Sequence, residues 1–365
     1  MIEVNHESLA RKIVNKCMRV KENEVILLSG GVYNFDLIEA IATNIRKVGA
    51  WPVTRVTSDN LSKRIISETP LKYLKKEPKY FVKWLDDIDG NIGIDPYTDP
   101  TTLSSLSEKR FGLNRQANRR LNDKFTKLGI RWTAIGYPTK EKAKMFKIPF
   151  GEFWDMFWSA MNVNYDAMYR RGTKVARALR GKKKVHITSD KGTDLTFRIT
   201  GRKPLIDDGV ISPQDLRNKD VGNNLPCGEV FLAPVETSAN GRAVFDLAFW
   251  RGNKITDIDI DFKKGKLSRV EARKNEKLLK EVIANSHGQK DRIGEFGIGI
   301  NPKVKKAVGY TITDEKIIGT IHIAIGENRS YGGKNEATIH WDFVMMRPTV
   351  DVDGKTIMKS GKLTV

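Results

Sequence analysis

Five acidic and histidine side chains in the second half of the chain have the types and strand positions of metal ligands. The chain has only five histidines, and two of them lie in one short segment, IIGTIHIAIGENRSYGGKNEATIHWDFVM. Imidazole and carboxylate groups together suit Zn, Mn, Co or Fe, whereas a Ca²⁺ site is built from oxygen ligands. The candidate ligands are Glu229, Glu295, His322, His340 and Asp342.

The two histidines of this segment are predicted to point away from the apolar face of their strands. Successive side chains of a strand point to opposite faces. In GTIHIAIG the three isoleucines therefore share one face, and His322 lies on the other with small neighbours. In TIHWDF, His340 and Asp342 share a face, roughly 6–7 Å apart along the strand. A lone strand histidine is usually only hydrogen-bonded, so the metal prediction depends on the candidates acting together.

Glu229 and Glu295 show a similar arrangement. Glu295 shares its strand face with Gly297 and Gly299, which carry no side chain to block access to it. Glu229 begins a strand after a Pro-Cys-Gly turn, and a carboxylate is costly to bury there unless it is paired or bound to a cation. Three carboxylates against two divalent cations leave a formal charge of about +1, which one hydroxide would neutralise. This arithmetic favours a two-metal hydrolase.

The elements that must position these residues form two regions. EVILLSG, a helix over NFDLIEAIATNIRKVG and the strand WPVTRVTS make a βαβ unit, which implies parallel strands. A basic helix near 105–128, the strand IRWTAIGYPT and a long helical stretch from about residue 150 follow. We therefore predict an α/β domain with a parallel sheet over residues 1–180, ending in a helical bridge. Residues 181–365 alternate with glycine turns and predict a mostly antiparallel β domain with a few helices, which holds the metal site.

Composition limits the class of protein. The absence of an apolar run near 18 residues excludes a transmembrane helix, and no signal peptide is evident, so we expect a cytoplasmic protein. Two cysteines far apart give no disulfide framework and no CxxC zinc pattern. The net charge of +20 is spread along the chain among acidic residues, which makes nucleic acid an improbable main partner. Lysine-rich, cysteine-poor usage fits a protein from a hot environment.

The candidate residues lie in motifs that resemble those of the M29 family of metalloaminopeptidases, the thermophilic aminopeptidase T type. The matching segments are NNLPCGEVF, RIGEFGIGIN, GTIHIAIG and IHWD, in the family's order and within residues 220–345. The resemblance implies that Glu229 and Glu295 are metal ligands, that Glu295 bridges two ions, and that two histidines and Asp342 complete the set. It also implies a homodimer.

Two positions depart from the family's pattern. The family carries a further glutamate five residues before the first histidine, where this chain has Ile317. It carries a catalytic tyrosine seven residues after that histidine, where this chain has Arg329. Glu327 and Tyr331 are the candidates to replace these two groups.

The leading functional hypothesis is an aminopeptidase that releases N-terminal residues from peptides. Divalent ions, two per chain and Zn, Co or Mn by type, would activate a water molecule, and a free α-amine could coordinate one of them. Glu295 or Glu327 would transfer the proton, and Tyr331 or Arg329 would stabilise the oxyanion.

Two rival hypotheses remain open. The same scaffold resembles that of a non-haem Fe(II) dioxygenase that opens hydroxylated pyridine rings, and two histidines with one carboxylate can hold such an iron. The third hypothesis is a non-catalytic, nucleic-acid-binding descendant of the fold, whose binding would depend on salt and survive loss of both histidines.

Overall fold

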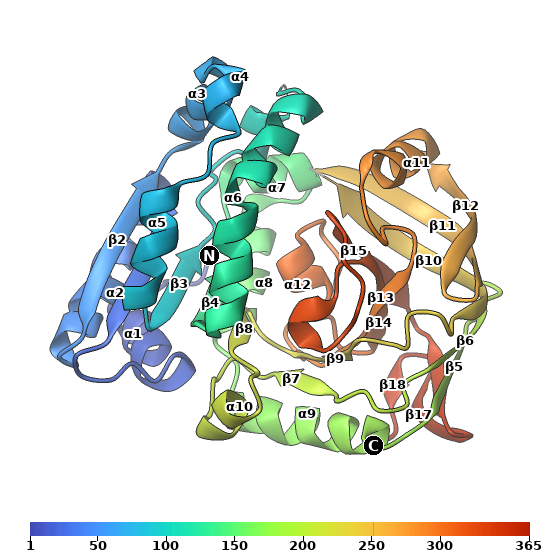
Figure 1. The fold of residues 1–365 in the computed structure, drawn as a ribbon. Coiled ribbons are helices and arrows are strands. Elements are labelled where there is room, and N and C mark those ends of the chain that lie inside the picture. The colour runs from blue at the N-terminus through green and yellow to red at the C-terminus, as the bar shows by residue number, and fades with distance from the viewer. Residues whose placement is uncertain (105, 251) are drawn as a thin grey trace. The chain divides into compact units, whose positions relative to one another are not determined.

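The structure is a computed structural model that describes residues 1–104, 106–250 and 252–365 (Figure 1). The chain divides into two compact units, each of which is described by itself. Unit 1 comprises residues 1–158 and 209–225, and unit 2 comprises residues 159–208 and 226–365. Whether the chain folds as two independent domains divided near residue 180 stays a prediction.

Unit 1 contains a five-stranded sheet in the order β2-β1-β3-β4-β8, with every neighbouring pair parallel. This confirms the predicted α/β architecture with a parallel sheet. The fifth strand, β8, comes from far along the chain and pairs with β4. The strands are β1 (Val25–Gly31), β2 (Trp51–Thr57), β3 (Gly90–Ile94), β4 (Arg131–Ile135) and β8 (Gly222–Leu225).

Helices connect and cover the strands of unit 1. Its described helical segments are α1 (His6–Lys12), η1 (Ile13–Cys17), η2 (Val32–Asn34), α2 (Phe35–Lys47), α3 (Asp59–Glu68), α4 (Leu71–Leu74), α5 (Lys79–Trp84), η3 (Leu85–Asp87), η4 (Pro100–Leu103), α6 (Glu108–Leu128), α7 (Lys140–Phe146) and α10 (Pro213–Arg217). The predicted basic helix near 105–128 is α6, which begins where the Ser107 side chain accepts a hydrogen bond from the Arg110 backbone N–H. Ser105, at the predicted start, lies outside the described residues.

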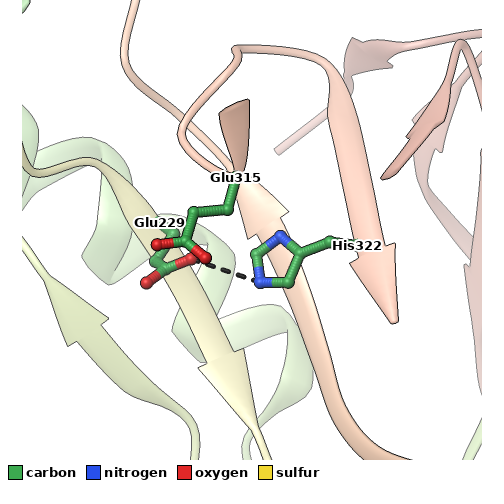
Figure 2. Close-up of side chains that lie close together, drawn as sticks. All are labelled: Glu229, Glu315 and His322. Carbon is green, nitrogen blue, oxygen red and sulfur yellow. Dashed lines mark ion pairs between the residues drawn. The ribbon is translucent and has the colours of Figure 1, made fainter. Parts of the chain in front are cut away.

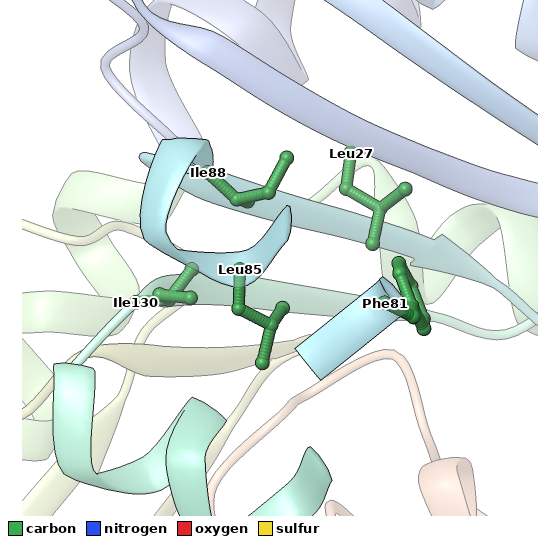
Figure 3. Packing of buried hydrophobic residues seen from close by; sticks show 5 residues of the cluster. All are labelled: Leu27, Phe81, Leu85, Ile88 and Ile130. Atoms are coloured by element: carbon green, nitrogen blue, oxygen red, sulfur yellow. The ribbon is translucent and has the colours of Figure 1, made fainter. Parts of the chain in front are cut away.

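One apolar cluster shows how the sheet of unit 1 is covered. Leu27 of β1 packs with residues from α5, η3 and the segment that leads into β4 (Figure 3). The cluster consists of Leu27, Phe81, Leu85, Ile88 and Ile130, all less than 9% exposed. Burial of such side chains contributes about 1.5–3 kcal/mol each and fixes the helical layer on the sheet.

The aromatic stretch after residue 150 forms two helices rather than one. α8 (Phe150–Met161) and α9 (Tyr165–Leu179) are separated by a short break. Asn164 ends the continuity, because its side chain accepts a hydrogen bond from the Ala167 backbone N–H and caps α9.

Unit 2 is built on a large sheet whose recorded strand pairs are antiparallel, as predicted. Its main order is β18-β17-β16-β5-β6-β10-β15-β14-β13-β9-β7, and β11 and β12 continue from β10. The strands are β5 (Lys184–Thr188), β6 (Asp194–Arg198), β7 (Leu205–Asp207), β9 (Glu229–Leu232), β10 (Asn240–Trp250), β11 (Asn253–Lys263), β12 (Lys266–Lys274), β13 (Ile293–Gly299), β14 (Thr320–Gly326), β15 (His340–Met346), β16 (Thr349–Val352), β17 (Lys355–Lys359) and β18 (Lys362–Leu363).

Few helices accompany this sheet. Besides α9, the described residues of unit 2 form α11 (Glu276–Asn285), α12 (Thr311–Asp314) and the 3-10 turn η5 (Arg329–Tyr331). α9 packs against β7 (Figure 1), where a side chain at Gly172 would collide with Ile206, so glycine permits the close approach. No helix in the described part of the chain is long and apolar enough to cross a membrane.

The strands β15, β14, β13 and β9 are neighbours in this order, and all five predicted ligands lie on them. One face of these strands carries the core. Phe296 and Phe343 are fully buried there and make ring contacts with Phe197 and Phe245, respectively. The opposite face is left for the polar residues.

Candidate metal centre

The strand register places the predicted ligands on one face of the sheet. Asp342 of β15 pairs with Ala324 of β14, which in turn pairs with Glu295 of β13. Directly paired residues of an antiparallel sheet point to the same side. Ala324 is small, so two carboxylates that lie two strands apart can approach the same space above it.

The glycines of β13 create room for the site but do not leave it open. His322 pairs with Gly297, where any side chain would collide with the imidazole ring. Glu229 pairs with Gly299, where a side chain would collide with the Ile317 carbonyl. The expectation that these glycines give free access to Glu295 is therefore wrong, because a ring and a backbone segment occupy the space.

Four of the predicted ligands form a compact group that we call the histidine cluster: Glu295, His322, His340 and Asp342. The two carboxylate oxygens of Glu295 lie 3.2 Å from His322 Nε2 and 3.5 Å from His340 Nε2. His340 Nε2 is also 3.5 Å from Asp342 Oδ1. His322 is fully buried, whereas the His340 side chain is 34% exposed and forms the side of the cluster that faces solvent.

Hydrogen bonds fix the orientation of the His340 ring. His340 Nδ1 lies 2.8 Å from the Glu327 carbonyl oxygen, to which it donates, and this leaves Nε2 directed at the carboxylates. The Tyr331 hydroxyl donates to the same carbonyl at 3.2 Å and lies 3.3 Å from His340 Nδ1. Such outer contacts are typical of metal-ligating histidines, because they hold the ligating nitrogen in place.

Glu229 belongs to a second group, which we call the lysine cluster: Asp207, Glu229, Glu315 and Lys316. Lys316 Nζ lies 2.6 Å from Glu229 Oε1, 2.9 Å from Glu315 Oε1 and 3.4 Å from Asp207 Oδ2. Figure 2 shows the carboxylates of Glu229 and Glu315 side by side, with the His322 ring facing them. His322 Nε2 is 3.3 Å from Glu229 Oε2, so this ring connects the two clusters.

The loop before β14 places Glu315 and Lys316. Asp314 accepts hydrogen bonds from the Val308 and Gly309 backbone N–H groups, which anchors the end of α12. The Lys316 carbonyl then accepts from the Asn301 N–H at 3.0 Å, and this holds the loop beside the end of β13.

Sequence reasoning missed three members of the lysine cluster: Asp207, Glu315 and Lys316. Counting five residues back from His322 gave Ile317, whose side chain is 1% exposed and has no polar atom. The structure instead brings the carboxylate of Glu315 to Glu229 and His322. The adjacent Asp-Glu-Lys triplet was the available signal, because consecutive charged residues directly before an apolar strand are costly to bury unless they are paired.

The side chains of Glu327 and Arg329, which were predicted to be catalytic, contact neither cluster and bind each other instead. The carboxylate of Glu327 accepts hydrogen bonds from Arg329 Nε at 2.8 Å and from the Ala337 backbone N–H at 3.0 Å. Arg329 also approaches Glu336 at 3.8 Å. The two charges thus pair with each other, and Glu327 reaches the site only through its carbonyl oxygen.

Burial and ion pairing shift the pKa values of both clusters. Burial alone would lower the pKa of His322, but a hydrogen bond to Glu295 and the nearby Glu229 raise it to about 9. The pKa of His340 is likewise raised to about 10, chiefly by Asp342, whose own pKa falls to about 2 beside the imidazole despite its burial. The metal-free histidine cluster therefore holds two imidazolium groups at neutral pH.

The lysine cluster behaves differently. Burial raises the pKa of Glu229 to about 8 and also raises that of Glu315, against the opposing effect of the Lys316 ammonium. Burial opposes the charge of Lys316, but Glu229, Glu315 and Asp207 outweigh it and hold its pKa well above the ordinary value. The three carboxylates thus stabilise the lysine ammonium inside the protein.

The residues present fit a divalent metal ion. Glu295, His322 and Asp342 offer ligand atoms within 4.8 Å of one another, and so do Glu229, Glu315 and His322. Asp342 Oδ1 and Glu229 Oε2 are buried and face imidazole nitrogens at 3.5 and 3.3 Å, without a hydrogen bond of good geometry among the described residues. A cation between these groups would satisfy the buried oxygens better. The mixed donor set is that of Zn, Mn, Co or Fe.

Comparisons with known proteins agree with the motifs. A family model described as thermophilic metalloprotease (M29) matches residues 3–363. Aminopeptidase T of Thermus aquaticus is 25% identical over 392 residues, which cover 96% of this chain and 94% of that protein. Aminopeptidase PepS of Streptococcus thermophilus is 23% identical over 402 residues, with coverage of 96% and 94%.

Two solved structures share the fold over the full length. Wild-type AmpT from Thermus thermophilus has a TM-score of 0.78 at 21% identity and covers 99% of both chains. The 2,5-dihydroxypyridine dioxygenase from Pseudomonas putida has a TM-score of 0.64 at 15% identity and covers 100% of this chain and 99% of its own. At these identities the two structures establish the fold of this chain and not its chemistry.

Proposed function

The chain belongs to the M29 family of thermophilic metalloproteases, and from this premise we propose that it is an aminopeptidase that releases N-terminal residues from peptides at the histidine cluster. The observation that carries the proposal is the convergence of Glu295, His322, His340 and Asp342 around one space, with His340 on the solvent side. The aminopeptidase names of the two sequence relatives support the choice of substrate.

When bound, a divalent cation of the Zn, Co or Mn type would polarise the scissile carbonyl and lower the pKa of water at the site. Glu295, His322, His340 and Asp342 would hold it. The hydrogen bond to the Glu327 carbonyl orients His340 as a ligand. The lack of a side chain at Gly297 leaves room for the His322 ring.

Glu295 and Tyr331 supply the remaining chemistry from the chain itself. Glu295 would accept a proton from the attacking water and deliver it to the leaving amine, so that water and one peptide bond give an amino acid and a shortened peptide. Burial and the neighbouring Glu295 hold the pKa of Tyr331 well above its ordinary value, so the phenol stays protonated. It would donate a hydrogen bond to the oxyanion that forms at the carbonyl.

The homodimer, the cytoplasmic location and the adaptation to heat remain predictions. So do the absence of a nucleic-acid partner and the preference for a free α-amine. None of them enters the argument for the site.

Hydrolysis of unblocked and blocked substrates tests the proposal. Protein loaded with Zn²⁺, Co²⁺ or Mn²⁺ should release arylamine from a panel of aminoacyl-arylamides but not from their N-acetylated forms. His340→Ala should abolish the activity. His287→Asn is the matched control, because His287 is exposed and does not belong to either cluster. Absence of release with every metal and substrate would refute the proposal.

A ring-opening dioxygenase is the second candidate, because His322, His340 and one carboxylate also match the ligand type of a non-haem Fe(II) site. The dioxygenase relative supports only the fold at its level of identity. Oxygen uptake with a hydroxylated pyridine, on iron-loaded protein inactive towards peptides, would favour this candidate over the peptidase.

A further inference from the structure

Lys316 places its ammonium group among the donors that a second metal ion would need. Its ammonium lies 2.6 Å from Glu229 and 2.9 Å from Glu315, which are two of the three residues in the second group of candidate ligands. An ammonium has three donors, and Asp207 at 3.4 Å is the third carboxylate around it.

The third residue of that group, His322, cannot serve two ions. Both groups of candidate ligands include His322, and its Nε2 lies between them, 3.2 Å from Glu295 and 3.3 Å from Glu229. One ring nitrogen has one lone pair and ligates one ion. If His322 serves the histidine cluster, Glu229 and Glu315 remain for the other position, and each already gives one oxygen to Lys316.

The lysine is also held in place. Its side chain is fully buried, its backbone N–H donates to the Thr313 carbonyl, and its carbonyl accepts from the Asn301 N–H. Asp207 faces Glu229 across the β7–β9 pair and lies on the other side of the ammonium. The ammonium therefore cannot move to solvent without disrupting the loop, and a divalent ion beside it would face electrostatic repulsion at short range.

We infer that Lys316 takes the place of a second metal ion, so that the site binds one divalent cation, in the histidine cluster. This inference rests on the proposed function only in taking the histidine cluster as the metal site. It replaces the two-ion expectation, whose charge arithmetic counted three carboxylates and did not include Lys316, Glu315 or Asp207.

Counting bound ions tests the inference without an activity assay. Metal-free protein is titrated with Zn²⁺ alone, and the ions per chain are counted by native mass spectrometry and calorimetry. The wild-type chain should bind one ion. Lys316→Met removes the charge at similar length and should bind two, because Glu229 and Glu315 are released. Lys305→Met, an exposed lysine upstream in the same loop, is the control and should bind one.

Each outcome has a defined meaning. Two ions in the wild-type chain would overturn the inference and leave the proposed function intact. One ion in a folded Lys316→Met chain would also overturn it, because the lysine would then not be what excludes the second ion. No bound ion at all would overturn both the inference and the proposed function.

A second measurement covers the case in which Lys316→Met does not fold. Wild-type protein given excess Mn²⁺ should show the electron paramagnetic resonance spectrum of an isolated Mn²⁺ ion. The spectrum of a magnetically coupled pair would overturn the inference whatever the variant does.

Discussion

The histidine cluster and the lysine cluster lie next to each other on one face of the same sheet, and His322 touches both. The first combines two imidazoles with two carboxylates and is reached from solvent through His340. The second has three carboxylates around a fully buried ammonium. Both clusters bury carboxylates. In the histidine cluster an exchangeable metal ion could neutralise them, whereas in the lysine cluster the Lys316 ammonium does so.

This difference separates two roles that are easily confused when a site is recognised from its acidic residues. The histidine cluster has the ligand chemistry of a catalytic metal. The lysine cluster is already neutralised in part and instead stabilises the strand start at Glu229 and the loop at Glu315. Variants of the histidine cluster should therefore weaken metal binding, whereas variants of the lysine cluster should chiefly destabilise the metal-free protein.

The largest effect on metal binding should come from the histidine cluster. His340→Ala removes a ligand on the solvent side, and we expect metal affinity to fall about 100-fold or more, together with loss of peptide hydrolysis. Calorimetry with Zn²⁺ and the arylamide assay measure the two effects. Equal metal affinity in His340→Ala and His287→Asn would remove the histidine cluster as the metal site.

The largest effect on stability should come from the lysine cluster. Lys316→Met leaves Glu229 and Glu315 buried without their cation, and the free energy of unfolding of metal-free protein should fall by about 3–5 kcal/mol. Chemical denaturation measures this, with Lys305→Met expected within about 0.5 kcal/mol of wild type. Zn²⁺ should restore much of the loss by occupying the vacated place. A wild-type midpoint in metal-free Lys316→Met would contradict the structural role of the lysine.

The sequence predicted the histidine cluster better than the lysine cluster, and the reason is physical. Alternation along β13, β14 and β15 determines which side chains share a face, so Glu295, His322, His340 and Asp342 could be placed together. Glu315 and Lys316 lie in a loop without periodicity. Their positions depend on a backbone hydrogen bond with Asn301 and on the lack of a side chain at Gly299, where the Ile317 carbonyl lies. Both are tertiary features. The same limit hides from the sequence that the carboxylate comes from Glu315, two residues before Ile317.

Tyr331 contacts His340, a predicted ligand of the histidine cluster, but is not itself a ligand. Tyr331→Phe removes the hydroxyl near His340 and should lower kcat about 100-fold while metal content stays unchanged. Tyr169→Phe, at an exposed tyrosine of α9, is the matched control. If Tyr331→Phe loses metal and activity in parallel, its role is to position His340 rather than to stabilise the oxyanion.

The last prediction concerns how metal affinity depends on pH. In metal-free protein the pKa values of His322 and His340 are raised to about 9 and 10, so both rings are protonated at pH 7. A metal ion needs neutral imidazole and displaces these protons. Apparent affinity should therefore rise about tenfold per pH unit for each proton released between pH 6 and 8.

The same shifts act on the stability of metal-free protein in the opposite direction. Because the folded pKa values exceed the unfolded value near 6.5, the stabilisation is complete below that pH and is lost as pH rises towards 9–10. Thermal unfolding of metal-free protein should therefore move to lower temperature as pH rises from 7 to 10. For the preceding prediction, a metal affinity that does not change between pH 6 and 8 would show that both imidazole rings are already neutral in metal-free protein.

Our proposal is that one divalent ion in the histidine cluster makes the chain a peptidase. Its most direct test is a titration of metal-free protein with Zn²⁺ in which release of arylamine from an unblocked aminoacyl-arylamide is followed at each addition. We expect activity to rise linearly and to reach its plateau at one equivalent per chain. Activity that appears only as a second equivalent binds, or that never appears, would contradict the claim.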